Sequence, residues 1–154
     1  AFESGTLTVS KAALTIRAED QSKVYGAALP TLTAGYSGFV NQDSASSLDS
    51  SVSLTTTATA SSNVGSYPIT AAGASDVNYT ITFESGTLTV SKAALTVRAE
   101  DKFMKQGGAL PVLTASYTGF VNQDTSGSLD VPVMLSRPVS WSRRVLVCIS
   151  VSSP

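Results

Sequence analysis

The sequence predicts a mainly β fold, either β-grasp-like or a small β-sandwich with at most one short helix, built as tandem repeat modules. The first observation is an internal repeat, and the second is that apolar residues alternate with Ser or Thr, which number 25 and 18 of the 154 residues. Such alternation is typical of strands with one buried face. The third is that no segment shows a sustained period of 3.6 residues, which excludes long helices.

The repeat defines the domain organisation. Residues 2–49 align without gaps with 83–130 at an offset of 81, with 35 of 48 positions identical, and residues 2–15 are identical to 83–96. A period of 81 residues has the size of a small domain rather than of a solenoid turn. We therefore predict the C-terminal strand of a preceding repeat in residues 1–11, a complete repeat in 12–92 and a partial second repeat in 93–135.

Residues 136–154 form a divergent tail. The repeat register is lost after Leu135, and the tail holds the only Trp, the only Cys and three of the five Arg residues. This abrupt change of composition favours a reading-frame slip. A divergent terminal repeat is the alternative, because terminal repeats are often atypical.

Within residues 12–92, alternating apolar residues predict strands around 14–18, 52–54, 67–69, 79–83 and 88–90, so five or six strands in all. Residues 83–87 are expected to form a tight hairpin in which Gly86 takes a positive φ. Pro68 lacks an N–H group and is therefore expected in an edge strand or at a strand start.

One helical turn and one junction complete this prediction. Asp43 is a candidate N-cap for a single turn that directs Leu48 inward. The stretch from Thr87 to Asp101 contains no Gly or Pro. We therefore expect the last strand of one repeat to run almost directly into the next repeat, which would make the joint stiff.

The composition excludes several classes of function. The chain has no His and one Cys, which excludes imidazole catalysis, histidine-ligated metals, an intrachain disulfide and a thiolate cage. A net charge of −1 gives no electrostatic footprint for nucleic acid or an anionic membrane. No apolar run is long enough for membrane insertion.

Three aromatic residues are weak candidates for ligand binding. Tyr25 could stack on a sugar, although a tyrosine closing the edge of the core explains it better. Its replacement by Gln106 in the second repeat weakens the case for a repeated site. Tyr36 and Phe39 flank Gly38 and could line a groove, but packing into the core is again favoured.

Paired carboxylates at 19–20 and 100–101 are candidates for Ca²⁺ binding or acid–base chemistry. A dense calcium loop is missing, as are a nucleophile and an activating base. We therefore expect solvated strand ends, and we predict no catalytic, cofactor-binding or metal-binding residue and no cofactor.

Several short motifs resemble those of the MBG domains of the YGX type, which are β-grasp-like repeats of large bacterial surface proteins and adhesins. The motifs are Lys-Val-Tyr-Gly at 23–26, Tyr-Ser-Gly-Phe-Val-Asn at 36–41, Gly-Ser-Tyr-Pro-Ile at 65–69 and Gly-Thr-Leu-Thr-Val at 86–90. The resemblance implies a small β module, exported and arrayed on the cell surface, without a catalytic site. It ties mucin or glycan binding to no particular residue.

The function predicted from repeat and resemblance is a non-catalytic spacer in the stalk of a secreted or surface-anchored bacterial adhesin. Its partners are then the neighbouring repeats of the same chain, and its location is extracellular. The alternative is a glycan- or mucin-binding module that acts by avidity, with or without an extracellular enzyme attached.

Overall fold

The computed structural model describes residues 2–136 and 148–150 of the chain. The chain divides into two compact units, residues 1–92 (unit 1) and 93–154 (unit 2). The fold is mainly β, as the sequence predicts, and the two helical turns in the described part of the chain are three residues long each. No helix in the described residues is long enough to cross a membrane.

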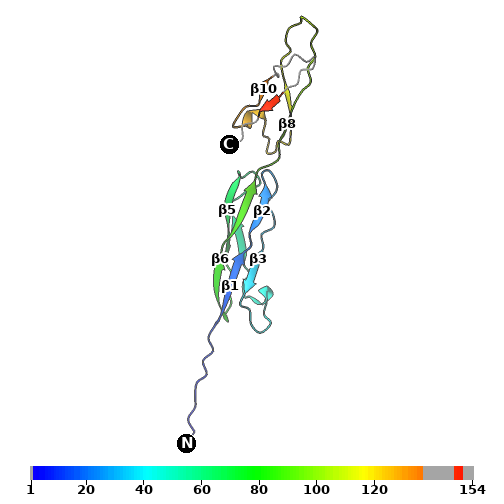
Figure 1. The fold of residues 1–154 in the computed structure, drawn as a ribbon. Coiled ribbons are helices and arrows are strands. Elements are labelled where there is room, and N and C mark those ends of the chain that lie inside the picture. Colours follow the sequence, from blue (N-terminus) through cyan, green and yellow to red (C-terminus); the bar gives the residue numbers. More distant parts are fainter. Residues whose placement is uncertain (1, 137–147, 151–154) are drawn as a thin grey trace. The chain divides into compact units, whose positions relative to one another are not determined.

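Unit 1 consists of two mixed sheets (Figure 1). Sheet A has the order β3 (Ala34–Ser37), β1 (Ala12–Ala18), β6 (Tyr79–Glu84), and sheet B has the order β2 (Gln21–Val24), β7 (Gly86–Ser91), β5 (Gly65–Ala72), β4 (Ser53–Thr56). β1 pairs with β6 in parallel and β2 with β7 in parallel, whereas the other neighbours are antiparallel.

The two parallel pairings form one continuous feature, which we call the parallel rails: residues 12–24 beside residues 79–91. Ala12 pairs with Tyr79 at one end and Val24 with Ser91 at the other, and the offset between partners stays constant where both rails pass from sheet A to sheet B. Thirteen residues at a strand rise of about 3.3 Å span about 40 Å. The chain therefore enters unit 1 at Ala12 and leaves it after Ser91, at the opposite end of the rails.

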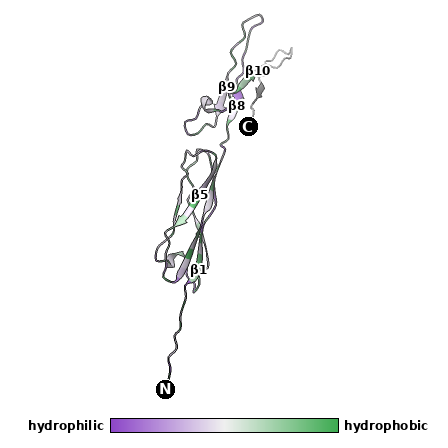
Figure 2. Ribbon diagram, turned by 90° about the vertical axis from the view of Figure 1, so that its left-hand side faces the viewer, coloured by the Kyte–Doolittle hydropathy of each residue, from purple (hydrophilic) through white to green (hydrophobic). Residues whose placement is uncertain are grey.

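The buried side chains of unit 1 form two clusters. Near the entry, Leu14 and Ile16 of β1 pack with Tyr79, and toward the exit Ile69 packs with Leu88 and small residues. Figure 2 shows apolar residues concentrated on the strands of unit 1, around β1 and β5. The alternating pattern is confirmed, because Leu14, Ile16, Leu88 and Ile69 are each at most 1% exposed.

The expected hairpin at residues 83–87 is wrong. β6 belongs to sheet A and β7 to sheet B, and Ser85 lies at the crossing between the sheets. Gly86 does not have a positive φ. Glycine is required at this position because a Cβ would lie 2.4 Å from the carbonyl oxygen of Ala18. Ala18 lies where the first rail also passes from sheet A to sheet B. Unit 1 has seven strands rather than the predicted five or six, because the alternating pattern did not predict β2 and β3.

The sequence predicts Pro68 in an edge strand or at a strand start, but β5 is an internal strand and Pro68 is its fourth residue. The physical constraint still holds locally. β4 pairs with residues 69–72 of β5, so at Pro68 the neighbouring strand is β7 alone. A missing N–H group is therefore tolerated on the side where no strand lies.

The helical turn is present as η1 (Ala45–Ser47), and Leu48 packs against the entry cluster as predicted. The expected cap is wrong, because Ser44 is the N-cap residue and its backbone N–H donates to Ser47 Oγ over 3.2 Å. The carboxylate of Asp43 accepts a hydrogen bond from Tyr79 instead.

Unit 2 repeats some of this arrangement. β8 (Thr96–Ala99) pairs with β9 (Ala115–Thr118) as β1 pairs with β3, η2 (Ser126–Ser128) follows, and β10 (Met134–Ser136) pairs with β11 (Cys148–Ser150). β7 ends at Ser91 and β8 begins at Thr96, so residues 92–95, which lie outside strands, connect the two repeats. Of the predicted tail, residues 137–147 and 151–154 lie outside the described residues.

Candidate functional site

Three aromatic rings meet near the entry end of unit 1. Tyr36 on β3 stacks on Phe39, with ring centroids 5.6 Å apart, and Phe39 meets Tyr79 of β6 edge to face at 5.7 Å. Both geometries are favourable for aromatic pairs. Tyr36 and Phe39 are half-buried and pack against the entry cluster. Two of the three sequence-predicted ligand candidates are thus brought together, with their rings partly covered by each other and by the core.

The hydroxyl group of Tyr79 is the polar centre of this region. It donates to Asp43 Oδ2 over 2.7 Å and accepts from the backbone N–H of Val40 over 3.0 Å. Burial of the ring raises the pKa of the Tyr79 hydroxyl, and the hydrogen bond to the Asp43 carboxylate raises it further, although the Val40 backbone opposes the shift. The hydroxyl is therefore protonated at neutral pH and acts as a structural donor.

A strained turn places these partners. Asn41 and Gln42 have φ values of 54° and 66°, and the Asp43 N–H donates to the Val40 carbonyl over 2.9 Å across the turn. Asn tolerates this left-handed backbone better than Gln, which pays a steric penalty there. The turn holds Val40 and Asp43 on either side of the Tyr79 hydroxyl.

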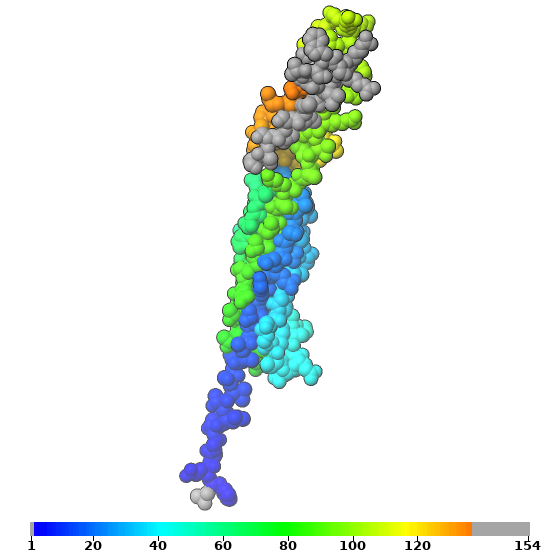
Figure 3. Space-filling model, in the orientation of Figure 1, coloured from blue at the N-terminus to red at the C-terminus, as the bar shows by residue number. Residues whose placement is uncertain are grey.

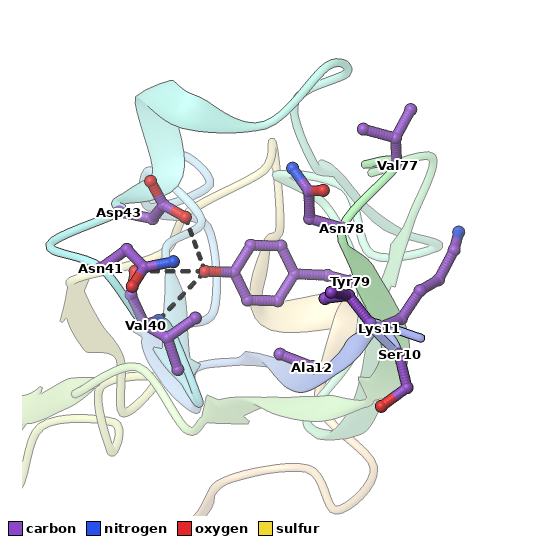
Figure 4. Close-up of a pocket in the computed structure, with 10 residues that line it drawn as sticks. Ser10, Lys11, Ala12, Val40, Asn41, Asp43, Val77, Asn78 and Tyr79 are labelled. Carbon is purple, nitrogen blue, oxygen red and sulfur yellow. Dashed lines mark hydrogen bonds between the residues drawn. The ribbon is translucent and has the colours of Figure 1, made fainter. Parts of the chain in front are cut away.

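These groups form one wall of a pocket of about 380 Å³ (Figure 4). Its lining comprises residues 9–12, 40, 41, 43 and 77–79. Lys11 and Asn78 supply charged and amide groups, and Val9 and Val77 supply apolar surface. The carboxylate of Asp43 is engaged by Tyr79, so the pocket could contact a ligand but contains no evident acid–base pair for catalysis.

Tyr25, the third predicted candidate, lies elsewhere. It is half-buried at the exit end of the rails, where its backbone N–H donates to the Ser91 carbonyl over 2.8 Å. Beside it, the 7% exposed Lys23 donates from Nζ to the carbonyl oxygens of Ala27 and Ala60, over 2.9 and 2.8 Å. The Lys23 ammonium group thereby links the loop that contains Ala27 to the loop that contains Ala60.

The paired carboxylates are engaged by protein donors. Glu19 accepts from the hydroxyl of Thr33, and Asp20 accepts from the Thr87 N–H over 2.7 Å. In the described residues, no three Asp, Glu, His or Cys side chains are grouped for a metal ion.

The same arrangement recurs in unit 2. Thr114 donates to Glu100, and this hydrogen bond, together with Lys102 at 3.2 Å, lowers the pKa of the Glu100 carboxyl. These carboxylates therefore fasten strand ends in both units.

The fold and the pocket define a small two-sheet β module that is repeated in tandem along one chain. The model of the MBG domain family (YGX type) matches residues 14–89 and 95–142, and the chain belongs to this family. The second match extends past Leu135, into the tail predicted to be divergent. No curated protein and no solved structure matches the chain.

The sequence interpretation missed the pairing of Tyr79 with Asp43 and the buried Lys23. One signal was present: Asn-Gln-Asp at 41–43 recurs at 122–124, again with left-handed backbone at Asn122 and Gln123. A repeated non-glycine pair at a turn indicates a geometry that packing maintains.

Proposed function

We propose that each repeat is a non-catalytic spacer in the stalk of a large secreted or surface-anchored bacterial protein of the adhesin type. The observation that carries the proposal is the pair of parallel rails. Because entry and exit lie at opposite ends of a 13-residue pairing, each copy advances the chain by about 40 Å.

Two further features support a spacer. In the pocket, the Tyr79 hydroxyl donates to the Asp43 carboxylate and accepts from the Val40 N–H, so these groups are already engaged within the repeat. Moreover, residues 2–49 and 83–130 are identical at 35 of 48 positions, although Tyr25 is replaced by Gln106. A spacer needs equivalent lengths and cores, whereas a binding array needs an equivalent surface.

The test measures how the length of an array and its binding to mucin or glycans change with the number of repeats. Arrays of one, two and three copies of residues 12–92 should grow in maximum dimension by about 40 Å per copy in small-angle scattering. The same arrays should pass unretarded over immobilised mucin and glycans, even at three copies, where avidity would amplify a weak site. Retention that grows with copy number and is lost on Tyr36→Ala would instead support the glycan- or mucin-binding module. A dimension that does not grow with copy number would contradict the spacer.

A further inference from the structure

The ladder between the two rails is interrupted where they pass from sheet A to sheet B. Figure 3 shows the first rail, in blue, beside the second rail, in green, along unit 1. Pairing in sheet A ends at Arg17 and its partner, and pairing in sheet B begins at Gln21 and its partner. Residues 18–20 of the first rail and 85–87 of the second rail lie between the two ladders, and we call them the crossing.

The crossing also changes which side chains face the core. On the first rail, Ile16 and Ala18 are buried before the crossing and Lys23 is buried after it. On the second rail, Tyr79 is buried before the crossing and Leu88 after it. Because side chains of a strand alternate with a period of two, these odd separations mean that both rails shift by one residue at the crossing. A shift of this kind disrupts a backbone ladder locally, as a β-bulge does.

One side chain spans this interruption. The Thr87 N–H donates to Asp20 Oδ1 over 2.7 Å, whereas an N–H group of a ladder ordinarily donates to a backbone carbonyl. Asp20 and Thr87 are 67 residues apart, which is the offset that partners keep along both rails. Asp20 also lies 3.8 Å from Arg17, but both side chains are more than half exposed, so this ion pair contributes little. The hydrogen bond of Asp20 therefore takes the place of a ladder bond.

The buried clusters show why this bond matters. The cluster near the entry contains Leu14 and Tyr79 of sheet A, and the cluster toward the exit is built around Ile69 and Leu88 of sheet B. Separate clusters allow one part of a fold to open while the other part stays closed. Contacts at the crossing join the two parts.

We propose that Asp20 couples the two sheets of the repeat, so that unit 1 opens as one cooperative unit rather than sheet by sheet. Its carboxylate supplies the acceptor at the crossing, and the two ladders then act as one. A repeat coupled in this way has few partly open states, which are the states that proteases cleave. This coupling is a property of unit 1 and does not depend on the spacer role.

The experiment is native-state hydrogen exchange of the full 154-residue chain, with Asp49→Ala as the perturbation. This substitution removes the acceptor of the Val77 N–H, which lies 3.0 Å from Asp49 Oδ2 and two residues before β6. With Asp20 in place, Asp49→Ala should speed exchange of the slowest amides about 5-fold in β6 and in β7 alike. In an Asp20→Ala background, the same substitution should speed exchange in β6 and leave β7 unchanged.

The matched variant is Asp20→Asn, whose side-chain oxygen still accepts from the Thr87 N–H. In this background Asp49→Ala should again affect both strands. The side chains of Asp20 and Asp49 are exposed, so the variants fold. An effect of Asp49→Ala that reaches β7 in the Asp20→Ala background would overturn the proposal, as would an effect confined to β6 in the parent chain. Equal behaviour of Asp20→Asn and Asp20→Ala would also contradict it.

Discussion

Leu88→Ala tests the assignment of β7 as the central strand, and the chain supplies its own control in Leu7→Ala. Both leucines lie in the same fourteen-residue sequence, so intrinsic strand propensity and local sequence are identical. Leu88 is 0% exposed between Ala18, Ile69 and Ala71, whereas Leu7 is 89% exposed. Any difference between the two variants therefore reports tertiary packing alone.

The magnitude follows from complete burial. Truncating a fully buried leucine to alanine costs about 2–5 kcal/mol, because transfer free energy is lost and a cavity remains. A module of about 80 residues is stable by roughly 4–12 kcal/mol, so this loss is a large share of the total. Truncating an exposed leucine changes stability by less than about 0.5 kcal/mol.

Native-state hydrogen exchange of the full chain is the suitable assay, because it resolves unit 1 from unit 2. The free energy of opening for amides of β1 and β5 should fall by about 2–5 kcal/mol in Leu88→Ala and stay unchanged in Leu7→Ala. Equal effects of the two substitutions, or none at Leu88, would refute the assignment.

Three further substitutions probe individual contacts of unit 1. Gly86→Ala should destabilise unit 1 by about 1–3 kcal/mol in urea titrations, because the added Cβ overlaps the Ala18 carbonyl. The control Gly5→Ala should leave the stability unchanged, because no atom lies within 4 Å of the added Cβ. Equal effects of the two substitutions would contradict the close approach at Gly86. Gln42→Gly should stabilise unit 1 by about 0.5–1 kcal/mol, since its φ of 66° suits glycine, and a lowered urea midpoint would argue against strain there. The raised pKa of Tyr79 means that the folded state holds its proton more tightly, so stability is fully present below about pH 10 and falls as the pH rises further. Tyr79→Phe should lower the melting temperature at pH 7 and flatten that alkaline decline, and an unchanged slope above pH 10 would assign the decline to other groups.

The sequence predicted the features of this fold that depend on neighbouring residues. Alternation marked the strands around Leu14 and Leu88, because burial of one face repeats every second residue. It did not reveal that β6 and β7 belong to different sheets, since the crossing at Ser85 depends on contact between Gly86 and Ala18, which lie far apart in the chain. A glycine required by close approach has the same sequence signature as a glycine required by a turn.

The candidate site shows the same limit. Tyr36 and Phe39 could be named from the sequence because they lie within one short motif. The third ring, Tyr79, and its hydrogen-bond acceptor Asp43 are 36 residues apart in the sequence. The turn at Asn41 and the pairing of the strands bring these two residues together, and neither is visible in the pattern of neighbouring residues. The strands were therefore predictable, whereas the hydrogen-bonded centre that joins them was not.

The parallel rails also determine how a repeat responds to tension. A pull on the two ends of unit 1 draws the first rail toward Ala12 and the second toward Ser91. Because the rails run in the same direction, these opposed forces slide one strand along the other, and the hydrogen bonds of both ladders are loaded together. An antiparallel terminal pair pulled from its open end would instead lose its hydrogen bonds in succession. Each module therefore resists stretching through its whole length at once, which suits the spacer role proposed above.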